Sequence, residues 1–174
     1  MRFRIIALLV ALALVSPTLG RSHAMAEPLR ADARVAFFGL TFIDTSTEGA
    51  VFGARDDEAA RIAMLETYVR DAFAEKGFAL LGLDPVRADL DRVVNPADCN
   101  GCDVRMAAKL GADYAVTGEV QKVSNLILSM NLVVREAENG AFVRGLSVDI
   151  RGNTDDSWRR GMRYILRNNI FKED

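Results

Sequence analysis

The sequence predicts one α/β (α+β) domain with a mixed sheet of about five strands and helices on one or both faces. Three observations predict it: an apolar, β-prone run at Val35–Ile43, helical spacing of apolar residues between Asp56 and Gly77, and alternation of apolar and polar residues after Gly111. Continuous apolar runs are typical of buried strands, and alternation is typical of half-buried antiparallel strands. The expected order is β-α-β-(α)-α-β-β-β-α, in which a C-terminal antiparallel meander precedes the last helix.

The first half of this order begins with Val35–Ile43 as a buried central strand. The loop after it, Asp44–Arg55, is rich in Asp, Thr, Ser and Gly, and is the longest irregular stretch. Long loops in compact domains are often functional or mobile. A helix is expected from Asp56 to a C-cap at Gly77. Phe78–Leu83 follows as a second buried strand.

The second half contains a short helix or turn at Val86–Val94 and a helix at Asp103–Leu110. Three alternating strands then form the meander, with a hairpin turn at Asn139-Gly140. The last helix is capped by Asn153 or Thr154. The strand positions that share an apolar face are Tyr114, Val116, Gly118, Val120, Leu126, Leu128, Met130, Leu132, Val134, Phe142, Leu146, Val148 and Ile150.

The N-terminus has the pattern of a cleavable secretory signal peptide. Two early arginines precede the apolar run Ile5–Val15, and Ala24-Met25-Ala26 fits a cleavage site. The run has 11 residues, and a membrane-spanning helix needs about 20. We therefore expect residues 1–26 to be removed and 27–174 to form a single domain in the periplasm, with no transmembrane segment after cleavage.

Cleavage also changes the chemistry available to the chain. The leader contains three arginines and no acid, so residues 27–174 carry 19 basic and 24 acidic side chains, a net charge of −5. An acidic domain is a poor general binder of nucleic acid. The sole histidine, His23, lies in the leader, so the mature domain has neither Ser-His nor Cys-His chemistry. We expect no enzyme activity, no catalytic residue and no cofactor.

Two segments resemble the corresponding segments of a known superfamily: Ala107–Val120 (AAKLGADYAVTGEV) and Val35–Ser46 (VAFFGLTFIDTS). It contains the amino-terminal domain of TolB, the curli protein CsgG and the lipoprotein activators of penicillin-binding proteins. The resemblance implies a second half of three strands and a helix. It also implies roles in binding and assembly rather than catalysis, although this chain has neither the β-propeller of TolB nor a pore-forming insertion.

The loop Cys99-Asn100-Gly101-Cys102 and the terminal Asn153–Leu166 (NTDDSWRRGMRYIL) resemble a narrower group. Its members are short secreted proteins of Gram-negative bacteria that carry a domain-of-unknown-function label. This resemblance implies a link to periplasmic quinoprotein alcohol dehydrogenases or to sensor kinases.

Cys99 and Cys102 allow three interpretations. A structural disulfide is favoured, because exported proteins keep their thiols oxidised. A redox pair is the second, since Cys102 begins a helix, where the dipole lowers the pKa of a thiol; Asp98 opposes this effect. A metal site is the third, but two thiolates without further ligands are incomplete, so no metal is expected here.

Two charged segments are candidate partner-binding sites. One is the Asp44–Arg55 loop. Its acids and hydroxyls, with Asp56, Asp57 and Glu58 after it, could also gather around Ca²⁺. The spacing is not that of an EF-hand, and a solvated loop followed by a normally charged helix start is favoured. The other is the arginine face of the last helix, for which a solvated face is again the simpler interpretation. The candidate partner-binding residues are Arg159, Arg160, Arg163, Arg167, Asp44 and Glu48.

The leading hypothesis is a non-enzymatic periplasmic accessory domain that binds another envelope protein. The alternative is a periplasmic protein that binds a small ligand or a metal ion. A thiol–disulfide factor that uses Cys99 and Cys102 is a third hypothesis. A homodimer that pairs through a sheet edge is a further expectation.

Overall fold

The computed structural model describes residues 28–172. The predicted signal peptide lies outside the described residues. The helices and strands are β1 (Arg34–Asp44), α1 (Thr47–Phe52), α2 (Asp56–Glu75), β2 (Ala79–Leu80), α3 (Arg87–Leu90), α4 (Cys102–Leu110), β3 (Tyr114–Ser124), β4 (Ile127–Glu136), β5 (Phe142–Arg151) and α5 (Asp155–Ile165). Short 3₁₀ turns precede α3 and α4, and a π-helical turn, Leu166–Ile170, continues α5.

The strands form one sheet in the order β2-β1-β3-β4-β5. β1 is parallel to β2 and to β3, whereas β3, β4 and β5 pair antiparallel in a meander. The predicted fold class and element order are therefore confirmed. The turn between β4 and β5 contains Gly140 at a φ of 75°, as expected for the Asn139-Gly140 hairpin.

A bulge in β1, an interior strand next to the central β3, changes which of its side chains face each side of the sheet. The register with β3 shifts between Phe37 and Leu40, and Gly39 has a φ of 91°. The N–H of Leu40 donates to Glu66 Oε1 on α2 at 2.8 Å, so this donor at the bulge is paired by a side chain. Phe37 and Leu40 consequently face the same core.

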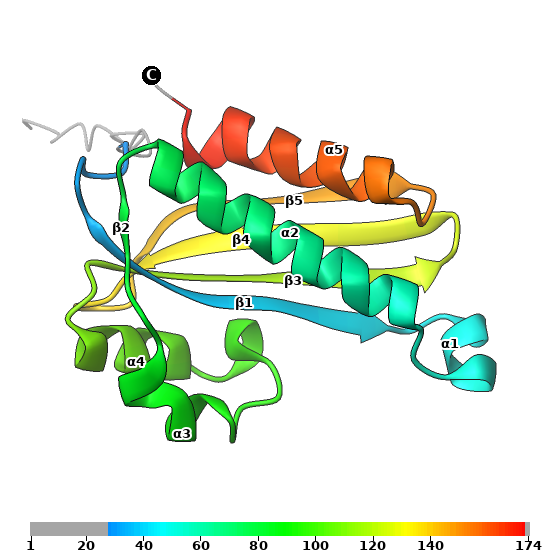
Figure 1. Ribbon diagram of the computed structural model, residues 1–174, viewed down its shortest axis with the longest axis horizontal. Helices are drawn as coiled ribbons and strands as arrows, with labels where there is room; N and C mark the ends of the chain where they lie inside the picture. Colours follow the sequence, from blue (N-terminus) through cyan, green and yellow to red (C-terminus); the bar gives the residue numbers. More distant parts are fainter. Residues whose placement is uncertain (1–27, 173–174) are drawn as a thin grey trace, which may run out of the picture.

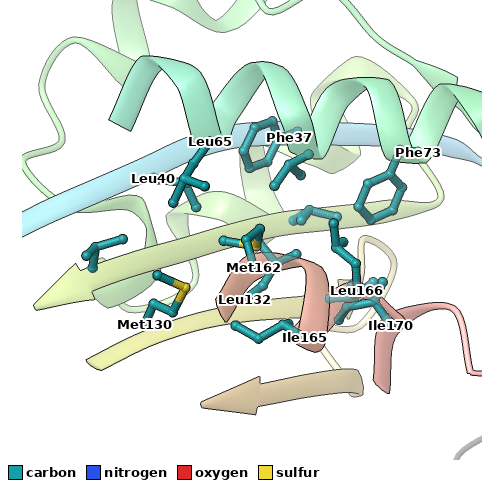
Figure 2. Packing of buried hydrophobic residues seen from close by; sticks show 14 of the residues in the cluster. Phe37, Leu40, Leu65, Phe73, Met130, Leu132, Met162, Ile165, Leu166 and Ile170 are labelled. Carbon is teal, nitrogen blue, oxygen red and sulfur yellow. The ribbon is translucent and has the colours of Figure 1, made fainter. Parts of the chain in front are cut away.

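Helices cover both faces of the sheet, although unequally. α2 and α5 lie along one face, and α3 and α4 lie on the other (Figure 1). The larger core is between the sheet and the first pair, where β1, β4, α2 and α5 interdigitate (Figure 2). The second core is smaller and joins β1 and β3 to α3 and α4 around Phe38, Val86 and Met106. The far face of β4 and β5 is thus left without a helix.

Two expectations about the first half are wrong. The strand predicted at Phe78–Leu83 is only Ala79–Leu80, and it forms an edge of the sheet rather than a buried strand. The last residue of β2 that pairs with β1 is Leu80, opposite Val35. Gly82 and Pro85, which disfavour a strand, follow within five residues. The Asp44–Arg55 loop, expected to be irregular, contains the short helix α1, which Ser46 caps by accepting a hydrogen bond from the N–H of Gly49.

Within residues 28–172, no helix is both long enough and apolar enough to cross a membrane.

Candidate functional site

The outer edge of β5 is the first component of the candidate site. β5 is the last strand of the sheet (Figure 1). At the start of the meander, the N–H of Ala137 donates to the carbonyl of Asp113 at 3.0 Å, and the N–H of Glu136 donates to the carbonyl of Ala141 at 2.9 Å. Even-numbered residues of β4 therefore turn their backbone groups toward β5. Their register partners on β5 are also even-numbered.

The odd-numbered residues of β5 consequently turn their N–H and C=O groups away from the sheet, since successive residues alternate in this direction. These residues are Gly145, Ser147, Asp149 and Arg151. No strand of the described chain pairs with this edge. Unpaired edge groups are a template for pairing with another chain.

The second component is α5, which lies against β5. A capping box begins the helix: the side chain of Thr154 accepts from the N–H of Ser157, and the Ser157 hydroxyl accepts from the N–H of Thr154. Trp158, Met162 and Ile165 are fully buried beneath it. The same turns carry arginines on the outward side, as the sequence predicts.

Gly161 sets how closely α5 approaches the sheet. A Cβ at this position would lie 2.6 Å from Ile150 Cγ2 and 2.8 Å from Met130 Sδ. Both distances are shorter than side chains tolerate. The glycine therefore lets the helix backbone lie directly on β4 and β5.

A groove of about 500 Å³ lies between β5 and α5. It is lined by Val148, Asp149, Ile150, Arg151, Ser157, Arg160, Gly161 and Tyr164. Tyr164 is 56% exposed, so the groove offers an aromatic ring to a ligand. We call this groove, together with the outer edge of β5, the β5 groove.

The charge of the β5 groove is mainly positive. Arg160 pairs with Asp156 across one turn at 3.2 Å, and both side chains are exposed. Within residues 28–172, Arg151, Arg163 and Arg167 form no ion pair. Their positive charges therefore remain available to a partner.

The predicted partner-binding arginines do not all belong to this site. Arg160 lines the groove, and Arg163 and Arg167 follow it on the exposed side of the helix. Arg159 points elsewhere, with Nε 3.0 Å from Met64 Sδ on α2. It therefore lies between the two long helices rather than at β5.

Asp44 and Glu48 are at another place, the end of the sheet where β1 meets α1. Asp44 accepts hydrogen bonds from the N–H and the hydroxyl of Ser46. It also forms an ion pair with Lys122, with Oδ2 and Nζ 3.0 Å apart. Glu48 Oε1 lies 3.4 Å from Nδ2 of Asn125 in the β3–β4 hairpin. Asp44 thus anchors the start of the loop internally.

The Lys122 ammonium is the centre of a buried network at this end. Lys122 pairs with Glu58 at 2.8 Å as well as with Asp44, and both Lys122 and Glu58 are 1% exposed. Asn153 Nδ2 donates to Glu58 Oε1 at 2.7 Å and Asn153 Oδ1 accepts from the Trp158 indole at 3.0 Å. The network therefore joins β1, α2 and β3 to the loop before α5.

This network shifts two pKa values. Burial opposes the ionised form of Asp44, but hydrogen bonds from Ser46 and the Lys122 ammonium outweigh it, so the pKa of Asp44 is lowered. Burial likewise opposes the charged form of Lys122, and the two carboxylates outweigh it, so the pKa of Lys122 is raised. Both groups are charged at neutral pH.

The sequence contained a signal for this network that periodicity analysis missed. Lys122 continues the alternation that places Val116, Gly118 and Val120 on the buried face, and Glu58 precedes Ile62 and Leu65 in the apolar stripe of α2. A charged residue in the phase of a buried stripe predicts an internal partner. Two of the acids considered for a Ca²⁺ site, Asp44 and Glu58, instead pair with an ammonium group.

Cys99 and Cys102 form a disulfide at the N-terminus of α4. The Cys99 sulfur lies 4.0 Å from Asp103 Oδ1, and the Asp103 side chain is nearly buried. The bond closes the turn between the 3₁₀ segment and α4. α4 lies on the face of the sheet opposite α5 (Figure 1).

Among residues 28–172, no group of three or more His, Cys, Asp or Glu side chains converges in a way that could hold a metal ion. The described chain also has no histidine. The open backbone edge, the apolar lining and the arginines of the β5 groove support recognition by backbone pairing, apolar contact and positive charge.

A family model, DUF3280, with the description "Protein of unknown function (DUF2380)", matches residues 33–170. No curated protein matches the chain. The match covers every strand and α1 to α5.

Several solved structures are similar to this chain. The LpoB C-terminal domain from Salmonella enterica is 15% identical, with a TM-score of 0.52 over 72% of this chain and 87% of that domain. The same domain from Escherichia coli is 14% identical, with a TM-score of 0.50 over 72% and 87%. Lipoprotein GNA1162 from Neisseria meningitidis is 13% identical, with a TM-score of 0.49 over 71% and 83%. For the two LpoB domains, identities this low establish a shared fold alone.

Proposed function

The chain belongs to the DUF3280 family of unknown function, and we propose that it is a non-enzymatic accessory domain of the periplasm that binds another envelope protein. One observation carries the proposal: the outer edge of β5 is unpaired in the described chain, and Arg151 on that edge forms no ion pair there, nor do the exposed Arg163 and Arg167 of the adjoining α5 and its π-helical turn. Charged groups that project from an interface steer association and select partners.

The shared architecture of the LpoB C-terminal domain supports the proposal, because that domain is also an envelope domain of this fold. The partner class to examine first is a periplasmic quinoprotein dehydrogenase or a sensor kinase, to which the resemblance in Asn153–Leu166 points. Export of the chain is part of the proposal and is tested by sequencing the N-terminus of the mature protein.

Crosslinking in intact cells tests the function. We expect the wild-type protein to crosslink to a discrete partner, and the variant with Arg163→Glu and Arg167→Glu to lose most of this product. The matched control reverses two exposed arginines on the other side of the sheet, Arg87→Glu and Arg92→Glu. The same charge change there should leave the crosslink intact. Equal loss in both variants, or no product in the wild type, would overturn the proposal.

A further inference from the structure

The edge of β5 presents a regular set of backbone groups to solvent. Four residues at alternate positions, from Gly145 to Arg151, turn their N–H and C=O groups outward, about 6.8 Å apart along the strand. At Gly145 the side chain of Phe142 folds over the far face of the sheet, where a Cβ would lie 2.8 Å from its ring. The outer edge from Ser147 onward remains open.

The space beside this edge has a particular shape and polarity. Val148 and Ile150 face α5, and Tyr164 stands opposite them across the groove. Side chains of an added strand would alternate, so every second one would enter this space. A side chain that enters this space would lie near Val148, Tyr164 and Arg160. Its neighbours in the strand would lie on the other face of the sheet, beside the odd-numbered side chains of β5.

We propose that the β5 groove receives an extended acidic segment of the envelope partner, which adds to β5 as a sixth strand. This inference rests on the proposed function and specifies its binding mode. Main-chain hydrogen bonds supply affinity in such complexes, and pockets for alternate side chains supply specificity. Here the outward backbone groups provide the first, and the groove with its arginines provides the second.

Charge selects an acidic segment over a second copy of this chain. Arg151 and Arg160 line the groove, against Asp149 at the edge, and the exposed Arg163 and Arg167 follow Arg160 along α5 and its π-helical turn. A second copy would offer its own β5, whose charged side chains are Arg144, Asp149 and Arg151. That strand has a net positive charge and does not complement the site, whereas carboxylates do.

Synthetic peptides provide a direct test. The probes are three blocked, fluorescent ten-residue peptides that alternate Glu with Val, Lys with Val, and Glu with Pro. We expect the Glu-Val peptide to bind the mature domain, as measured by anisotropy. The Lys-Val peptide should bind at least tenfold more weakly because of its charge, and the Glu-Pro peptide because it lacks half of its N–H donors.

Substitutions at the edge test the binding mode. Ser147→Pro removes an outward N–H but no hydrogen bond to β4, and edge strands tolerate proline at such positions. This variant should bind the Glu-Val peptide at least tenfold more weakly than the wild type. Ser147→Thr is the matched control and should bind as the wild type does. Asp149→Asn removes the edge acid, so it should tighten binding about threefold, a readout that remains if the proline variant fails to fold.

Amide hydrogen exchange locates the contact. The bound Glu-Val peptide should protect the N–H groups of Ser147 and Asp149. Equal binding of the Glu and Lys peptides, absence of protection at β5, or full binding by a folded Ser147→Pro variant would overturn the proposal. A concentration-dependent dimer in sedimentation that Ser147→Pro abolishes would also overturn it, because β5 would then pair with a second copy. If the cellular crosslink depends on Arg163 and Arg167 but survives Ser147→Pro, the proposed function stands and strand addition fails.

Discussion

Lys122 and Glu58 form an ion pair in which Nζ and Oε1 are 2.8 Å apart and both side chains are 1% exposed. Removing charges from water costs several kcal/mol per ion unless they are paired and hydrogen-bonded. Asp44 and Asn153 supply the additional contacts, at 3.0 Å and 2.7 Å. The pair therefore fixes β3 against the first turn of α2 at the end of the sheet where α1 begins.

Replacing the lysine alone should be strongly destabilising. Lys122→Met would leave Glu58 buried without its cation, and breaking a buried pair from one side costs about 3–5 kcal/mol. Urea unfolding measures the loss. The matched control is Lys109→Met, which removes an exposed pair with Asp89 of 2.9 Å and should cost no more than about 1 kcal/mol. Equal losses for the two variants would contradict a stabilising role for the buried pair.

Replacing both partners should be milder than replacing the lysine alone. Glu58 Oε2 has no hydrogen-bond partner among the described residues, so the native pair already includes a desolvated oxygen. Buried pairs that are exchanged for apolar residues of similar volume are often neutral. We expect Lys122→Met with Glu58→Leu to recover at least half of the loss of Lys122→Met in the same urea experiment. A double variant as unstable as the sum of the two single variants would exclude coupling between them.

The network also predicts the pH dependence of stability. The folded pKa of Asp44 is lowered, so its contribution is present above its unfolded pKa of about 3.9 and is lost as the pH falls through the folded value. The folded pKa of Lys122 is raised, so its contribution is present below about 10.4 and is lost as the pH rises through the folded value. Stability measured from pH 2 to 12 should therefore decline at both ends.

Two variants separate the acid decline in stability from the alkaline decline. Asp44→Asn should reduce the loss of stability at low pH in part, and Lys122→Met should reduce the loss of stability at high pH. If the melting temperature of the wild type and of Lys122→Met changes equally between pH 9 and pH 12, the lysine is not responsible.

The elements that periodicity predicted well are those whose burial is regular along the chain. β3, β4 and β5 alternate because one face packs on α2 and α5, and the Asn139-Gly140 turn fixes their connection. β2 was predicted too long, because the run Phe78–Leu83 is apolar for a different reason. Leu81 and Leu83 leave the sheet and pack against the second core instead.

The candidate site was only partly predictable. The arginines of α5 are visible in the sequence, since they alternate with the stripe that contains Trp158 and Met162. The sequence does not show that these arginines point to different places. Arg159 contacts Met64 on α2, whereas Arg160 lines the groove. This depends on how α5 lies between α2 and β5, a relationship between distant segments. The same holds for the open edge of β5, which only the strand order reveals.

The close approach at Gly161 predicts the effect of one methyl group. Gly161→Ala would place Cβ 2.6 Å from Ile150 and 2.8 Å from Met130. Alanine gains about 1 kcal/mol of helix propensity, but overpacking typically costs about 1–3 kcal/mol. We expect the variant to unfold at lower urea concentration and to open the β5 groove. The control, Gly82→Ala, has no atom within 4 Å of the added Cβ and should change stability by less than about 0.5 kcal/mol; a Gly161→Ala variant as stable as this control would contradict the steric argument.

The disulfide between Cys99 and Cys102 is at the start of α4, on the opposite face of the sheet from α5. Loop entropy for so short a ring gives a contribution of about 2 kcal/mol. We expect Cys99→Ser with Cys102→Ser to lower the melting temperature and to leave both the cellular crosslink and binding of the Glu-Val peptide unchanged. A variant that folds but loses the crosslink would instead favour the thiol–disulfide hypothesis. Addition of a reductant to the wild-type protein should reproduce the thermal shift of the serine variant, and the variant itself should not respond to it.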